Sequence, residues 1–108
     1  MGKKSREKGK RGERELAKKL NELFNVKARR GRQYKGSPES PDVHAFDGIH
    51  IECKRTEKFN AYAALEQAGD DAGDAVPVVM HKRNYKPWIV VVELEDLPRL
   101  IKLLEDYL

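Results

Sequence analysis

The sequence predicts an α/β fold in which helices cover a mixed β-sheet. Apolar residues recur at helical spacing near both ends of the chain, over residues 12–25 and 95–108. Between them lie an alternating apolar and polar hairpin at 42–55 and two β-branched runs at 76–80 and 87–94. With a further helix at 60–72, the predicted order is α-β-β-β-α-β-β-α.

The first helix is predicted over residues 12–25, "GERELAKKLNELFN". Its apolar side chains fall on one face: Leu16, Ala17, Leu20, Leu23 and Phe24. Before it, residues 1–10 carry many cations and no apolar periodicity, so we expect a flexible basic arm. Residues 11–108 are then a single domain, which is the usual organisation for a chain of this length.

The remaining segments follow from local signals. Residues 26–29 are predicted as a short strand, and residues 30–40, "RGRQYKGSPES", as a loop because they are rich in Gly, Ser and Pro. The runs at 76–80 and 87–94 are continuously apolar, which is typical of buried strands. In the last helix, Asp96 is a plausible N-cap.

Charge is distributed unevenly along the 108 residues, whose net charge is +4. Cations dominate the first third and acids collect in later segments, a pattern that indicates a polyanionic partner, most often DNA or RNA. A solvated basic tail would explain the first ten residues equally well. The cations that we expect to contact a nucleic-acid backbone are Arg11, Arg14, Arg29, Arg30, Arg32 and Lys35.

Other function classes are disfavoured by what the chain lacks. No apolar run is long enough to span a membrane, and no signal-peptide pattern opens the sequence. One cysteine cannot form an internal disulfide, and three scattered histidines do not match a structural zinc pattern. We therefore expect a cytoplasmic protein, in the host cell if the gene is viral.

The loop length of the hairpin decides which of its side chains share a face. A two-residue turn at Asp47-Gly48 would mix apolar and charged residues on both faces. A three-residue loop at 46–48 pairs Ala45 with Ile49 and gives Gly48 the left-handed conformation that such loops need. Because it segregates the side chains completely, we predict this register. The polar face then carries Asp42, His44, His50, Glu52 and Lys54.

In this register Asp42 lies directly opposite Glu52, with Cβ atoms about 5 Å apart. Two facing carboxylates repel each other, and a divalent cation such as Mg²⁺ would stabilise them. Lys54, two residues further along the same face, could hold a phosphate or a water molecule. The alternative is an ordinary polar surface on which Lys54 neutralises one acid.

Three further side chains bear on this site. Glu13 falls on the apolar side of the first helix, where a carboxylate needs a partner, so we expect it to point toward Asp42 and Glu52. Its position in the first turn would also suit the helix dipole. We interpret His44 and His50 as polar surface side chains; the alternative is that either one touches DNA or assists a proton transfer.

These residues resemble a known nuclease signature. Pro41-Asp42, followed after nine residues by Glu52-Cys53-Lys54, is similar to the PD-(D/E)xK motif. "KRGERELAKKL" resembles the opening helix of the archaeal-type Holliday junction resolvases, and "VPVVMHKRNYKPWIVVVEL" resembles their last strand pair. The resemblance covers most of residues 8–95 and implies a restriction-endonuclease-like fold.

The resemblance also implies roles for individual residues. Glu13, Asp42, Glu52 and Lys54 match the catalytic positions. The metal ligands would be Asp42, Glu52, the backbone carbonyl of Cys53, and Glu13. The implied protein is a homodimer that cuts four-way DNA junctions with Mg²⁺, or with Mn²⁺ in its place.

Two other interpretations remain open at this point. A nicking or restriction-type DNA endonuclease would use the same metal site on other DNA. A non-catalytic basic module that binds nucleic acid would explain the charge, but not three charged hairpin residues on one face.

Overall fold

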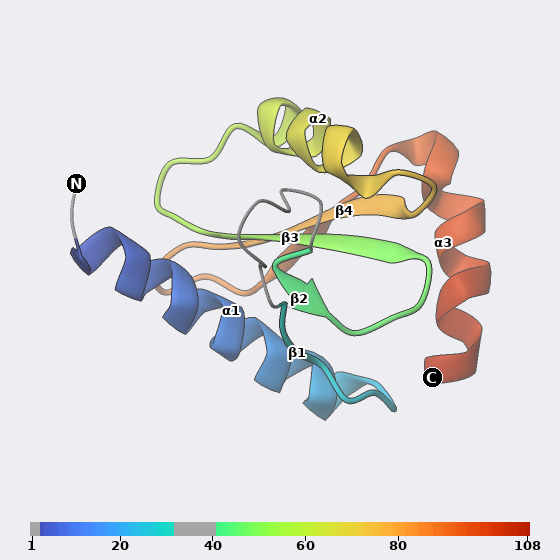
Figure 1. Ribbon diagram of the computed structural model, residues 1–108, viewed down its shortest axis with the longest axis horizontal. Coiled ribbons are helices and arrows are strands. Elements are labelled where there is room, and N and C mark those ends of the chain that lie inside the picture. The colour runs from blue at the N-terminus through green and yellow to red at the C-terminus, as the bar shows by residue number, and fades with distance from the viewer. Residues whose placement is uncertain (1–2, 32–40) are drawn as a thin grey trace.

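The computed structural model of the protein describes residues 3–31 and 41–108, and it has the predicted α/β architecture (Figure 1). In chain order the helices and strands are α1 (Lys3–Leu23), β1 (Arg29–Arg30), β2 (Val43–His44), β3 (Ile49–Arg55), α2 (Ala61–Ala72), β4 (Val76–Lys82), β5 (Ile89–Val91) and α3 (Leu97–Leu104). Short 3₁₀ turns, η1 (Leu94–Asp96) and η2 (Glu105–Tyr107), flank α3. The predicted order α-β-β-β-α-β-β-α is confirmed.

The strands in the described part of the chain form one sheet in the order β1-β2-β3-β4-β5. Only β3 and β4 run parallel, joined by a crossover through α2; the other neighbours are antiparallel. The long central pair is in register from Ile49 with Val76 to Arg55 with Lys82. Neighbouring side chains on β3 and β4 therefore point to the same face at each level.

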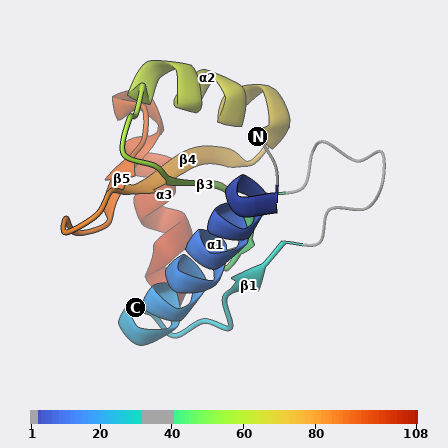
Figure 2. The same cartoon turned by 90° about the vertical axis from the view of Figure 1, so that its left-hand side faces the viewer.

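The helices cover the two faces of the sheet unequally. Seen nearly edge-on in Figure 2, α2 lies on one side of β3 and β4, and α1 and α3 lie on the other. The larger core lies beneath α1 and α3 and includes the fully buried Leu16, Val43 and Ile51. The smaller core lies beneath α2, where Ala64, Leu65 and Ala68 pack against Val79. The sheet is thus a layer between two helical layers.

Several boundaries differ from the sequence prediction. The first helix begins at Lys3 rather than residue 12, so the segment that we expected as a flexible basic arm is helical in the structure. Lys, Arg and Glu are good helix formers, which allows a helix to extend without an apolar face. The strand expected at 26–29 lies at Arg29–Arg30. Residues 32–40 of the expected loop lie outside the described residues.

The C-terminal elements also differ in detail. The run 87–94 was predicted as a buried strand, but β5 is a short edge strand in which Ile89 and Val90 are 47% and 56% exposed. A continuous apolar run does not distinguish an edge strand from a central one. Asp96 stands before α3 but its side chain makes no capping hydrogen bond. By contrast, the Asn60 side chain caps α2 by accepting from the Ala63 N–H at 3.0 Å.

No helix among the described residues is both long and apolar enough to cross a membrane.

Candidate active site

The hairpin has the predicted three-residue loop. Val43 pairs with Ile51, and Gly48 has φ +80°. This register sets Asp42 opposite Glu52, as expected from the alternation. Val43, Ile49 and Ile51 are buried in the core on the opposite face. Their burial therefore fixes the direction in which the polar side chains of the hairpin point.

The backbone of Asp42 is held from both sides. Its N–H donates to the carbonyl of Ile51 at 2.9 Å, and its own carbonyl accepts from the N–H of Gly31 at 2.8 Å. A Cβ on Gly31 would overlap the backbone oxygen of Pro41, so only glycine permits this approach. Gly31 falls in the loop expected at 30–40, and no local signal in the sequence indicates this role.

Asp42 and Glu52 face each other across the hairpin, close enough for each carboxyl group to shift the pKa of the other. Burial first, and then the charge of Glu52, raise the pKa of Asp42 to about 7 against the opposing hydrogen bond from the Cys53 N–H. That N–H donates to Asp42 Oδ2 at 2.8 Å. Burial acts to raise the pKa of Glu52, but hydrogen bonds with His50 and Asp42 outweigh it, and the pKa is lowered. Two such facing carboxyl groups suit a divalent cation, which would remove their repulsion.

Glu13 lies near this pair. It comes from α1, is 18% exposed at the side chain, and its charge contributes to the raised pKa of Asp42. The preceding residue, Gly12, is buried against β3, where an added Cβ would lie 2.5 Å from Arg55 Cβ. The missing side chain therefore lets α1 approach β3 closely and brings Glu13 to the hairpin.

Lys54 and Cys53 follow Glu52 on β3. Lys54 is half-buried, and its charge helps to lower the pKa of Glu52. The Cys53 side chain faces the larger core, where burial and then the charge of Asp42 raise the pKa of its thiol to about 12. A thiol with this pKa stays protonated at neutral pH and is a poor nucleophile.

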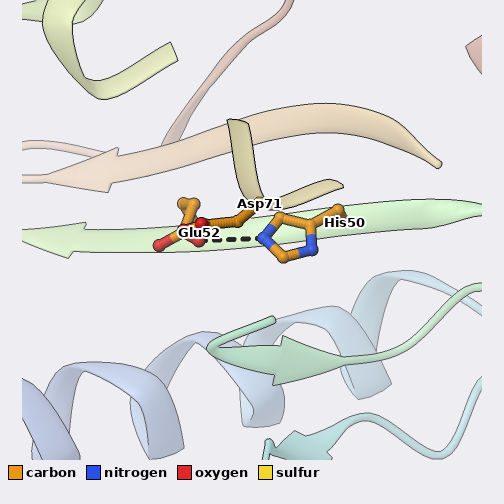
Figure 3. A group of neighbouring side chains, drawn as sticks. All are labelled: His50, Glu52 and Asp71. Atoms are coloured by element: carbon orange, nitrogen blue, oxygen red, sulfur yellow. Dashed lines mark hydrogen bonds and ion pairs between the residues drawn. The ribbon is translucent and has the colours of Figure 1, made fainter. Parts of the chain in front are cut away.

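His50 is the main correction on this face. We expected a surface histidine, yet its side chain is 4% exposed beneath α2, whereas His44 is exposed as expected. His50 Nε2 lies 2.9 Å from Glu52 Oε1, and Asp71 of α2 brings a ligand atom within 4.8 Å of both (Figure 3). The hairpin pattern told us which face His50 is on, but it did not reveal that α2 covers this face.

The predicted DNA-contacting cations fall into three groups. Arg11, Arg14 and Arg29 are exposed. Arg30 is half-buried, and its Nε donates to Glu13 Oε2 at 3.1 Å, so its charge is partly neutralised. Arg32 and Lys35 lie outside the described residues. An open groove of about 470 Å³ runs between α1 and β1, and its basic lining residues are Arg14, Lys18, Arg29 and Arg30.

Comparison with known families agrees with this geometry. Residues 4–107 match the family described as "Phage putative PDDEXK endonuclease". The chain belongs to this PD-(D/E)xK endonuclease family. No curated protein gave a significant match.

A solved structure supports the same assignment of fold for the endonuclease. The 1.6 Å structure of Archaeoglobus fulgidus Hjc, a Holliday junction resolvase from an archaeal hyperthermophile, superposes with a TM-score of 0.56. It is 25% identical in sequence, and the match covers 76% of this chain and 74% of that one. The expected restriction-endonuclease-like fold is therefore confirmed, and the family implies a DNA substrate and a divalent metal.

Proposed function

We propose that this endonuclease is a structure-selective enzyme that cuts branched DNA, with the four-way Holliday junction as its substrate. The observation that carries the proposal is the register of the hairpin, which sets Asp42 opposite Glu52 and near Glu13, in a chain whose fold matches that of a junction resolvase.

Asp42, Glu52, the carbonyl of Cys53, and Glu13 would hold one or two Mg²⁺ ions, with Mn²⁺ as a substitute. The bound metal would polarise the phosphate and lower the pKa of the attacking water. Lys54, on the same face as Glu52, would orient that water. Arg11, Arg14 and Arg29, together with Arg32 and Lys35, would contact the backbone phosphates.

A homodimer follows from the proposed substrate, because a four-way junction requires two symmetric cuts. The exposed apolar side chains of β5 and the exposed side of α3 are candidate faces for the second copy. Sedimentation equilibrium of the purified protein, alone and with a junction, would test this assembly.

The decisive experiment compares cleavage of a labelled four-way junction with that of a linear duplex of matched sequence, in Mg²⁺, Mn²⁺ or EDTA. Asp42→Asn removes a proposed ligand, and Asp47→Asn, an exposed aspartate of the same hairpin, is the matched control. We expect metal-dependent, paired nicks on the junction for the wild type and the control only. Equal cutting of linear duplex would replace junction selectivity with a nicking or restriction-type activity. Binding without cleavage in any metal would favour a non-catalytic module.

A further inference from the structure

A buried histidine touches one of the proposed metal ligands. His50 and Glu52 lie two residues apart on β3, both beneath α2, with side chains 4% and 8% exposed. Because an ionised carboxylate only accepts hydrogen bonds, Nε2 of His50 is the donor in the 2.9 Å contact with Glu52 Oε1. A charged carboxylate at this depth requires such a partner.

Glu52 therefore has neighbours on two sides. His50 lies against Oε1, and Asp42 faces the same side chain from the other side of the hairpin. The backbone does not fix the rotation of a glutamate side chain, which has three torsions of its own. The hydrogen bond from a buried ring removes much of this freedom. It leaves the remaining lone pairs of Glu52 directed away from His50.

We propose that His50 is a positioning residue that holds Glu52 in the orientation in which Glu52 and Asp42 bind a divalent cation together. This inference rests on the proposed function, since it concerns the same metal site. Groups that hydrogen-bond to metal ligands commonly contribute 10- to 100-fold to metal affinity, about the size of effect we expect here.

Asp71 offers a different interpretation of the same cluster. With one ligand atom from each of His50, Glu52 and Asp71 within 4.8 Å, these three could in principle bind a cation themselves. The 2.9 Å contact instead directs the N–H of His50 Nε2 at Glu52 Oε1, and a nitrogen that carries this hydrogen has no lone pair free to bind metal. Asp71 then serves as a neighbouring charge, and the site does not depend on it.

Two amide substitutions of His50 test whether its hydrogen bond to Glu52, rather than the volume of its side chain, supports metal binding. In His50→Gln the side-chain nitrogen can reach the place of Nε2, whereas in His50→Asn the shorter side chain stops near the place of Nδ1. Calorimetric titration of the full-length protein with Mn²⁺ should give wild-type-like affinity for H50Q. For H50N the dissociation constant should rise 10- to 100-fold, as for other lost contacts to metal ligands. Asp71→Asn should bind Mn²⁺ like the wild type, and thermal unfolding would verify that each variant is folded.

The outcomes are distinct. Unchanged Mn²⁺ affinity in folded H50N would overturn the inference and leave the proposed function intact. Equal losses in H50Q, H50N and D71N would also overturn it, because they would make His50 and Asp71 direct ligands. Absence of Mn²⁺ binding by the wild type would overturn the proposed function, and the inference would fall with it.

Discussion

The two faces of the central sheet differ in what they bury. Beneath α1 and α3 the buried side chains are apolar, with Val43, Ile51 and Val78 at 1% exposure or less. On the face that α2 covers, the same strands bury His50 and Glu52, and also His81, which stacks on Phe59, next to a smaller apolar cluster. Adjacent residues of β3, such as Ile51 and Glu52, thus contribute to opposite environments.

Side chains that stabilise the fold and side chains that form the candidate site therefore alternate along β3. Apolar burial on one face sets the register, and the register sets which polar groups meet on the other face. A buried carboxylate pair opposes folding unless it is partnered, so the polar face depends on the apolar one. Substitutions on the two faces should therefore change different measured quantities.

The largest effect is expected from Glu52→Gln. Removing a proposed metal ligand should slow Mg²⁺-dependent cleavage by about 10³-fold, because a catalytic metal supplies several kcal/mol of transition-state stabilisation. The free energy of unfolding should change little, since the weaker hydrogen bond with His50 is offset by removal of the repulsion between Glu52 and Asp42. Cleavage assays and urea unfolding would measure the two effects. Glu66→Gln, an exposed site on α2, is the matched control; a stable Glu52→Gln variant with full activity would contradict the assignment.

The opposite result is expected on the apolar face. Leu100 of α3 is 6% exposed, and Leu100→Ala should lower the free energy of unfolding by about 2–5 kcal/mol. Affinity for Mn²⁺, measured at a temperature where the variant is folded, should be unchanged. The neighbouring Ile101 is 53% exposed, and Ile101→Ala should change stability by about 0.5 kcal/mol or less. Similar losses in both variants would mean that α3 does not pack as described.

The two faces also differ in how far the sequence could predict them. The alternation in the hairpin is local, and it predicted the register of Val43 with Ile51 and the facing of Asp42 and Glu52. The burial of His50 depends on α2, a separate element whose placement on that face is not encoded in the hairpin. Local patterns therefore identified the face, and tertiary packing decided whether it was covered.

The ends of helices and strands likewise depend on more than local patterns. The apolar stripe of α1 starts near Leu16, so periodicity could not place the helix start at Lys3. The exposure of Ile89 and Val90 depends on β5 being at the sheet edge, which is a property of topology. The role of Gly31 likewise becomes visible only when Pro41 lies against it.

A smaller effect is expected at the contact between α1 and the sheet. Gly12→Ala adds a Cβ 2.5 Å from Arg55 Cβ, so α1 must shift, at a cost of about 1–3 kcal/mol. The shift should also move Glu13 and reduce Mg²⁺-dependent cleavage. Gly9→Ala, in the same helix with nothing within 4 Å, should instead stabilise by about 0.5–1 kcal/mol. Thermal unfolding would compare the two, and equal stabilisation would exclude close packing at Gly12.

The smallest expected effect distinguishes two adjacent arginines of β1. Arg29 is exposed, whereas Arg30 donates to Glu13 Oε2. If Arg29 neutralises one DNA phosphate, Arg29→Gln should make the slope of log binding constant against log salt shallower by about 0.9. Arg30→Gln should change this slope less, because Glu13 already offsets its charge. Fluorescence titrations of a labelled four-way junction in EDTA, at several salt concentrations, would measure both slopes without cleavage. Equal changes would mean that Arg30 leaves Glu13 to contact DNA, and the ion pair would then belong to the free protein alone.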